Sequence, residues 1–228
     1  MTAERSEFAN SGNTGNISIA IDGPAGAGKS TIAKEISKRL SITYVDTGAM
    51  YRAIGLKAMR MGIDPADVRR VVPMLDGTNV SVQHVLLDGE DVSELIRTEE
   101  VSHYASVIST IPEVRKKLVE LQRALARVRN VVMDGRDICS YVLPDATHKF
   151  FVTAEPEVRA ARRYTEYEAA GKLNGRNFDD ILCEIKRRDE RDSTREAAPL
   201  RPADDAVVID TSEMNVESAV AAVLAHIG

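Results

Sequence analysis

Short apolar runs alternate with amphipathic stretches along most of the chain. Residues 17–21 form one apolar run, and further runs end at Val45, Met133, Val152 and Ile209. Runs of this length, bounded by polar residues or glycine, are typical of buried strands. Most of the stretches between them repeat apolar residues at helical spacing. Strands that alternate with helices predict an α/β fold with a central parallel sheet flanked by helices.

Helical patterns follow both the first and the last apolar run. Ile32, Ile36 and Leu40 recur on one face of residues 29–40, which predicts a helix directly after a glycine-rich turn. A second amphipathic stretch begins at Asn215. Its apolar residues share one helical face: Val216, Ala219, Val220, Val223, Leu224 and Ile227. We interpret this last helix as a packing helix that carries no chemistry.

Two segments interrupt the alternation of strands and helices. Residues 76–110 contain short alternating stretches around Asp88 and Gly89, a pair that favours a hairpin turn. Residues 159–201 are rich in charged side chains. We therefore predict a single unit over residues 17–228, with an inserted lobe at 76–110 and a lid at 159–201. The core of this unit would comprise residues 17–75, 111–158 and 202–228.

Composition limits the classes of protein to which the chain can belong. The 228 residues carry a net charge of -5, which argues against a surface that grips nucleic acid. Aromatic residues make up only 4%, with no tryptophan, which argues against stacking of single-stranded nucleic acid. No apolar run approaches the roughly 18 residues that a membrane helix needs. We expect neither a nucleic acid nor a membrane partner, and nothing here requires more than a monomer.

The cysteines and the first residues bear on the cellular compartment. Residues 1–16 are polar and lack the basic start and apolar centre of a signal peptide, so we expect a disordered extension. Cys139 and Cys183 lie far apart, with no C-x-x-C pair, so neither a disulfide framework nor a zinc site is indicated. A reducing cytoplasm fits these features.

The strongest motif is a glycine-rich loop that follows the first apolar run. Residues 23–30 read G-P-A-G-A-G-K-S and match G-x-x-x-x-G-K-[ST] between a predicted strand and a predicted helix. Inward-turned amides and the positive end of a helix suit a phosphate. Lys29, expected at an exposed loop end, would reach the β- and γ-phosphates, and Ser30 would ligate Mg²⁺. The expected nucleotide contacts are Gly23, Pro24, Ala25, Gly26, Ala27, Gly28, Lys29, Ser30 and Thr31.

A phosphate loop alone does not separate a kinase from a GTPase or a nucleotide-dependent switch, so the acceptor side must decide. Thr47 and Arg52 follow the second apolar run, where a hydroxyl and a guanidinium fork would bind a monophosphate. The alternative makes Asp46 a helix N-cap and Arg52 a solvated surface residue.

Residues 134–137 read D-G-R-D and follow a predicted central strand. Asp134 would order Mg²⁺-bound water or position an acceptor, and Arg136 offers a second phosphate fork. Asp137 offers a hydrogen-bond acceptor for an amino group. A plain turn at Asp134-Gly135 is the alternative, although charges at a buried strand end are costly without a partner.

An arginine-rich stretch lies in the predicted lid. Arg188, Arg191 and Arg195 recur at helical spacing, and arginines on a mobile lid stabilise the negative charge that develops in phosphoryl transfer. The alternative is a solvated helix face, with Arg188 and Asp192 as an i,i+4 ion pair.

Together these motifs resemble bacterial cytidylate kinases, members of the P-loop nucleoside monophosphate kinases. The shared segments are G-P-A-G-A-G-K-S-T, D-T-G-A-M-Y-R, L-D-G-E-D-V-S-E-L-I-R-T-E-E-V, D-G-R-D and R-R-D-E-R-D-S-T-R-E-A-A-P-L. They run in order from about residue 17 to the C-terminus. The resemblance implies a P-loop kinase with a monophosphate-binding insert and a lid. It also implies transfer of the γ-phosphate of ATP, with Mg²⁺, to CMP or dCMP.

The resemblance implies a role for each matching residue on the acceptor side. The acceptor phosphate would be held by Thr47, Arg52, Arg136 and Arg195, the last reaching it from the lid. Cytosine would be read by Ser106, Arg115 and Asp137. The sugar hydroxyls would be held by Arg188 and Asp192.

The same resemblance nominates residues for the transferred phosphoryl group. The catalytic candidates are Lys29, Arg136, Arg188 and Arg195. Candidate phosphate or ATP-side contacts are Arg162, Arg163 and Arg191.

The chain departs from the family directly after Asp137. A small Gly-Thr-like pair usually follows there, whereas this chain has Ile138 and Cys139. We favour a tolerated packing substitution. Nearby arginines would lower the pKa of the Cys139 thiol, which predicts partial inhibition by alkylation.

Two other functions remain open at this point. One is a kinase for UMP or for another small phosphorylated acceptor, and the other is a nucleotide-dependent switch or sensing ATPase. Asp137 favours cytosine, because uracil would present a carbonyl oxygen to the carboxylate. The inserted lobes and the acceptor-type arginines argue against a switch.

Overall fold

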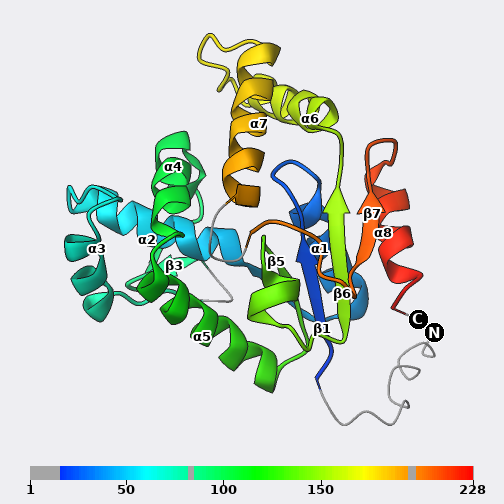
Figure 1. Cartoon of the computed structure of the whole chain (residues 1–228), viewed down its shortest axis with the longest axis horizontal. Coiled ribbons are helices and arrows are strands. Elements are labelled where there is room, and N and C mark those ends of the chain that lie inside the picture. The colour runs from blue at the N-terminus through cyan, green and yellow to red at the C-terminus, as the bar shows by residue number, and fades with distance from the viewer. Residues whose placement is uncertain (1–15, 82–84, 195–198, 228) are drawn as a thin grey trace, which may run out of the picture.

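A five-stranded parallel sheet forms the centre of the computed structural model, which describes residues 16–81, 85–194 and 199–227 (Figure 1). The strand order is β2-β5-β1-β6-β7, and every neighbouring pair is parallel. The strands are β1 (Ser18–Asp22), β2 (Thr43–Asp46), β5 (Val131–Asp134), β6 (His148–Thr153) and β7 (Val207–Asp210). The predicted α/β fold is therefore confirmed, with β1 starting and ending one residue later than expected.

Helices cover both faces of this sheet. On one face lie α1 (Lys29–Leu40) and α8 (Val216–Leu224), whose apolar residues share a core with Ile19 and Ile21 of β1. On the other face lie α2 (Thr47–Arg60) and α5 (Pro112–Val128), in the core that contains Ala20. Successive residues of β1 thus face opposite layers, as a buried parallel strand requires. Helix α1 has the predicted bounds, and α8 begins directly after Asn215, where the amphipathic stretch begins. The Asn215 side chain caps α8 by accepting a hydrogen bond from the amide of Ser218.

The segment after α2 builds a lobe beside α2, although with less strand than the alternating pattern suggested. Its elements are α3 (Val68–Met74), η1 (Leu75–Gly77), β3 (Leu86–Leu87), β4 (Glu90–Asp91), η2 (Leu95–Arg97) and α4 (Glu99–Ile108). The hairpin turn is present: Asp88 and Gly89 have φ of 52° and 90°, the left-handed values that a tight hairpin turn uses. Residues 82–84 of the predicted alternation lie outside the described residues.

Helix α4 fills much of this lobe and packs along α2 (Figure 1). It starts where the Thr98 hydroxyl accepts a hydrogen bond from the amide of Val101, a standard N-cap. The helices approach closely at Gly55, where an added Cβ would lie 3.0 Å from the amide nitrogen of Ala105.

Two helices, α6 (Pro156–Ala169) and α7 (Phe178–Thr194), lie beyond the carboxyl ends of the strands (Figure 1). They share a small apolar core of their own, made by Ala160, Ile181 and Ile185. Arg195, which follows α7, lies outside the described residues, as do residues 1–15 of the predicted extension. Within the ranges described here, no helix is both long and apolar enough to cross a membrane.

Three aspartates gather at the carboxyl edge of the sheet. Asp22, Asp46 and Asp134 end β1, β2 and β5, and the register pairs Asp46 with Asp134. The π-helical turn η3 (Ile138–Val142) follows β5 at the same edge. Ligands of open parallel sheets bind outside this edge, so the fold brings the predicted motifs together where chemistry is expected.

Candidate active site

A cavity of about 600 Å³ opens at the carboxyl edge of the sheet, between the phosphate loop, the lobe and the helices α6 and α7. It collects most of the predicted residues. Those that line it are Ala25, Gly26, Gly28, Lys29, Ser30, Thr31, Thr47, Arg52, Ser106, Arg115, Asp134, Arg136, Asp137, Arg162, Arg163, Arg188 and Asp192. Residues far apart in sequence therefore share one site.

The phosphate loop has the backbone that its glycines predict. Gly26 and Gly28 have φ of 79° and 90°, in the left-handed region that glycine enters without strain. Gly23 lies against β6, where an added Cβ would lie 1.9 Å from the carbonyl oxygen of Val152. Gly28 caps α1, so the amides of the loop precede the positive end of that helix.

Lys29 is buried, which corrects the expectation of an exposed loop end. Its side chain turns back so that Nζ donates a 2.6 Å hydrogen bond to the Pro24 carbonyl, and only 5% of the residue is exposed. Burial, together with the nearby Arg136, holds the pKa of Lys29 well below its usual range. The loop closes over the ammonium group, and the Pro24 carbonyl accepts a hydrogen bond from it there.

Ser30 and Asp134 are joined at the end of β5. The Ser30 hydroxyl donates a 2.7 Å hydrogen bond to Asp134 Oδ2, and the Tyr44 hydroxyl donates a 2.9 Å bond to Asp134 Oδ1. Burial and the neighbouring Asp46 raise the pKa of Asp134. Tyr44 had no signal in the sequence, because its role follows only from the position of β2 beside β5.

Helix α2 begins at the wall of the cavity that Thr47 and Arg52 line. Asp46 caps it by accepting a 2.8 Å hydrogen bond from the amide of Ala49, and Arg52 lies 3.2 Å from the same carboxylate. The capping alternative is therefore correct for Asp46, and Arg52 nonetheless lines the cavity. Thr47 is buried and donates a 2.7 Å hydrogen bond to the Asp134 carbonyl.

Arg136 and Asp137 of the D-G-R-D segment contact different charged partners. Arg136 Nε donates a 2.9 Å hydrogen bond to Asp192 Oδ2 on α7, which links the end of β5 to the helix pair. Asp137 forms a buried ion pair with Arg115 of α5, and Tyr141 lies with its ring 5.1 Å from the same guanidinium. Two of the three residues predicted to read cytosine, Arg115 and Asp137, thus already contact each other.

Arg188 on α7 brings a second guanidinium close to Arg136. Its Nε lies 4.0 Å from Asp192 Oδ2, so the i,i+4 pair considered above is present at long range. Among the described residues, that buried Nε has no hydrogen-bond partner. Burial, followed by the charge of Arg136, lowers the pKa of Arg188 to about 10. This part of the cavity therefore holds excess positive charge.

The remaining arginines differ in their positions. Arg162 lies by the phosphate loop and donates 2.6 Å and 3.2 Å hydrogen bonds to Thr211, whose hydroxyl lies 3.1 Å from the Ala27 carbonyl. Arg163 Nε donates a 3.0 Å bond to the Tyr167 hydroxyl. Arg191 is exposed on α7 and is not among the residues that line the cavity.

Sequence reasoning missed Arg159, a buried arginine that donates a hydrogen bond to the Ala25 carbonyl of the phosphate loop. It precedes Arg162 and Arg163 by one helical turn in α6, and this spacing was its only signal. It also missed an ion pair between Arg176 and Glu99, which joins the connection between α6 and α7 to the start of α4. The lobe is therefore in contact with the connection between α6 and α7.

The environment of Cys139 corrects the expected reactive thiol. The side chain is 1% exposed, and Sγ lies 3.5 Å from the carbonyl oxygens of Ala20 and Phe150. Burial, with the nearby Asp22, raises the pKa of the thiol instead of lowering it. Its backbone amide and that of Ile138 each donate a 2.8 Å hydrogen bond to Asp22. The geometry fits the packing substitution that we favoured.

The phosphate loop at the end of β1, helix α2 and the arginine-bearing helix pair α6 and α7 define the class of the protein. All three surround one cavity at the carboxyl edge of a parallel sheet. Loop, lysine and convergent guanidinium groups are the parts with which P-loop kinases position and stabilise a phosphoryl group. The fold and the site are those of a P-loop kinase.

The chain belongs to the cytidylate kinase family, whose model matches residues 19–228. The cytidylate kinase of Caldicellulosiruptor saccharolyticus is 51% identical over 214 residues, covering 91% of this chain and 94% of the relative. That of Clostridioides difficile is 46% identical over 215 residues, covering 93% and 99%. The predicted enzyme class, a nucleoside monophosphate kinase, is thereby confirmed, and the UMP kinase and switch alternatives are not favoured.

Solved structures of lower identity share the fold. A shikimate kinase from Bacteroides thetaiotaomicron superposes with a TM-score of 0.50 at 16% identity, covering 92% of this chain and 98% of that structure. An uncharacterized protein from Eubacterium ventriosum gives a TM-score of 0.52 at 13% identity, covering 93% and 98%. At such identities the likeness extends to the fold alone.

Proposed function

We propose that the chain transfers the γ-phosphate of ATP to CMP or dCMP, giving CDP or dCDP, by in-line displacement. The observation that carries this proposal is the convergence of Lys29, Arg136 and Arg188 in one cavity. Burial and the charge of Arg136 lower the pKa of both Lys29 and Arg188. A transferring phosphoryl group between them would relieve this repulsion and receive the stabilisation that phosphoryl transfer requires.

The phosphate loop binds the donor. Its amides and the start of α1 hold the ATP phosphates, and Lys29 exchanges the Pro24 carbonyl for phosphate oxygens. Arg162 lies next to this loop, through its bonds to Thr211, and serves the ATP side. Catalysis then follows from positioning and charge stabilisation, with no covalent intermediate on the enzyme.

Ser30 and Asp134 are the residues that would hold Mg²⁺. A hydroxyl and a carboxylate are hard oxygen ligands, and Mg²⁺ commonly takes one or two such groups beside nucleotide phosphates and water. The 2.7 Å bond between them keeps both oxygens at the same point of the cavity, next to the loop. When bound, the ion would neutralise charge on the β- and γ-phosphate oxygens.

The acceptor lies on the opposite side of the transferred group. The residues proposed for its phosphate are Thr47, Arg52, Arg136 and Arg195, and those for its sugar are Arg188 and Asp192. The base is read by Ser106, Arg115 and Asp137. The ion pair between Arg115 and Asp137 fixes the carboxylate, so it can accept a hydrogen bond from the cytosine amino group without turning away.

The division of the chain follows from these roles. Residues 17–75, 111–158 and 202–228 form the core, residues 76–110 the monophosphate-binding insert and residues 159–201 the lid. None of the proposed roles calls for a residue from a second chain, so we propose that the enzyme acts as a monomer. Both cysteines are free thiols, which suits a reducing cytoplasm.

ADP release from ATP and Mg²⁺ tests the proposed reaction, with CMP, dCMP, UMP and AMP supplied separately and with no acceptor as the control. We expect rapid release with CMP and dCMP and much slower release with UMP and AMP. Release that does not depend on an acceptor would contradict the proposal.

A further inference from the structure

Arg159 is a buried charge that none of the proposed contacts with substrate uses. It lies in the first turn of α6 and is 3% exposed. The phosphate loop packs directly against it, since a Cβ added to Gly26 would lie 3.1 Å from the Cβ of Arg159. Burying a guanidinium group costs free energy unless its N–H donors form hydrogen bonds, so Arg159 needs partners for these donors.

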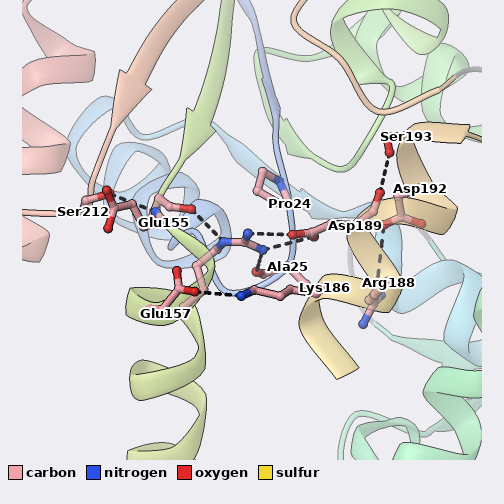
Figure 2. Close-up of polar contacts among 12 residues, drawn as sticks. Pro24, Ala25, Glu155, Glu157, Lys186, Arg188, Asp189, Asp192, Ser193 and Ser212 are labelled. Carbon is pink, nitrogen blue, oxygen red and sulfur yellow. Dashed lines mark hydrogen bonds and ion pairs between the residues drawn. The ribbon is translucent and has the colours of Figure 1, made fainter. Parts of the chain in front are cut away.

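Its partners lie on three separate segments. Nε donates a 2.8 Å hydrogen bond to the Ala154 carbonyl, and Nη1 donates a 3.2 Å bond to the carbonyl of Ala25 in the phosphate loop. The two terminal nitrogens also form a fork on Asp189 of α7, with Nη1 to Oδ1 at 3.1 Å and Nη2 to Oδ2 at 2.6 Å. In Figure 2, dashed lines join both Asp189 and Ala25 to the same guanidinium group. A fork of two parallel bonds fixes orientation as well as distance.

Asp189 occupies a sensitive position on α7. It is the neighbour of Arg188 and precedes Asp192 by less than one helical turn. Figure 2 shows Arg188 and Asp192 on the same short stretch of helix. Because successive residues of a helix are related by a fixed rotation, holding Asp189 determines where Arg188 and Asp192 point. Arg136 contacts Asp192 from the other side, at 2.9 Å.

We infer that Arg159 is a positioning residue, which holds α7 and the phosphate loop in register through Asp189 and the Ala25 carbonyl. This inference rests on the proposed roles of Arg188 and the loop. In the proposed function the phosphate loop binds ATP, and Arg188 of α7 stabilises the transferring group. A displacement of about 1 Å between such parts costs on the order of 10²-fold in rate.

The chain supplies a matched control on the same two helices. Lys186 of α7 and Glu157 of α6 form a 2.9 Å ion pair, with side chains 54% and 52% exposed (Figure 2). Exposed ion pairs of this kind contribute little to stability. Removing this pair therefore shows whether the loss of any contact between α6 and α7 changes the rate. A role specific to Arg159 leaves the Lys186→Ala variant unaffected.

The test measures steady-state kinetics and thermal melts of three variants: Arg159→Lys, Asp189→Asn and the double variant that combines them. Lys186→Ala is measured in the same way as the control. Lysine keeps the charge but cannot form the fork, and asparagine keeps the shape but loses the charge. We expect kcat to fall by about tenfold or more in each single variant, while the KM values for ATP and CMP stay within about threefold. The double variant should be no slower than the slower single one, because the two residues act as a unit.

A purely structural role gives a different result. The melting temperature would fall, and kcat per folded molecule would remain within about twofold of the wild type. That result, or additive losses in the double variant, would overturn the inference. Arg188→Ala is measured in parallel: wild-type turnover there would refute the proposed role of α7, whereas a loss in Arg188→Ala without one in Arg159→Lys would refute positioning alone.

Discussion

The Ser30 hydroxyl donates a 2.7 Å hydrogen bond to Asp134, joining the phosphate loop to the end of β5 across 104 positions of sequence. The carboxylate is buried, and its second oxygen accepts a bond from Tyr44. A buried carboxylate whose two oxygens are held in this way is pre-organised for a cation beside the ATP phosphates. In the proposed function, this bond keeps the serine that follows Lys29 beside the carboxylate that would hold Mg²⁺.

Asp134→Asn should weaken the response of the enzyme to Mg²⁺. The amide keeps the size of the side chain but supplies no anionic ligand, so we expect kcat to fall by about 10²-fold and the half-saturating Mg²⁺ concentration to rise. Rates measured over a Mg²⁺ titration check this. Tyr44→Phe, which removes only the bond from the Tyr44 hydroxyl, should change the rate by less than about tenfold. An unaltered Mg²⁺ dependence in Asp134→Asn would refute the role.

Asp137→Asn should reduce the preference for cytosine over uracil. An amide can donate to the uracil carbonyl, whereas the carboxylate repels it. We expect the ratio of kcat/KM for CMP to that for UMP to fall by about tenfold or more. Steady-state kinetics with both acceptors check this. The KM for ATP reports on the phosphate loop and should stay constant. An unchanged ratio would move base selection to Ser106 or Arg115.

Cys139 should resist alkylation in the folded enzyme. It is buried and burial raises its pKa, whereas Cys183 is exposed. After treatment of the folded enzyme with iodoacetamide near neutral pH, mass spectrometry should find the label on Cys183 alone. Cys139 should become labelled only after denaturation. Activity should remain unchanged by the label on Cys183. Fast labelling of Cys139 in the native state would show that the segment after Asp137 opens.

Asp22 should make stability depend on pH. Burial raises its pKa to about 6 from 3.8, so the folded state binds its proton more tightly than the unfolded state does. The stabilisation from this group is fully present below the unfolded pKa and is lost as the pH rises through the folded pKa. Relative to Asp22→Asn, the wild type should therefore lose up to about 3 kcal/mol of unfolding free energy between acid and neutral pH.

Denaturant unfolding of both proteins at several pH values checks the effect of Asp22. The comparison with the variant is needed because Asp88 and Glu90 have lowered pKa values and lose their contributions as the pH falls. These groups are present in both proteins and cancel in the difference. A difference that does not vary with pH would show that the pKa of Asp22 is the same in the folded and unfolded states, and would contradict the prediction.

The features that local pattern controls could be predicted from the sequence. The bounds of α1 follow from its apolar spacing, and the backbone of the loop follows from Gly26 and Gly28, which must enter the left-handed region. The hairpin turn at Asp88 and Gly89 is equally local. In each case the residues that determine the structure are neighbours in the chain, so their pattern is visible before folding.

The features that depend on distant segments could not be predicted. Lys29 is buried because the loop closes over it, and Tyr44 reaches Asp134 only because β2 pairs with β5. The fork between Arg159 and Asp189 joins residues 30 positions apart on two helices. Helix α4 was missed because the alternating residues before it suggested strands. Packing decides these features, and a single sequence does not display packing.

The central claim is that the cations of this cavity stabilise the group transferred to a cytidine monophosphate. Its most direct test is the kcat for ADP formation with CMP in Lys29→Met, which keeps the buried stem but removes the charge. The matched control is Lys38→Met, which removes an exposed charge from the same helix. We predict a loss of about 10²- to 10³-fold in Lys29→Met, with its melting temperature maintained and wild-type turnover in Lys38→Met. Turnover by Lys29→Met within about twofold of the wild type would contradict the claim.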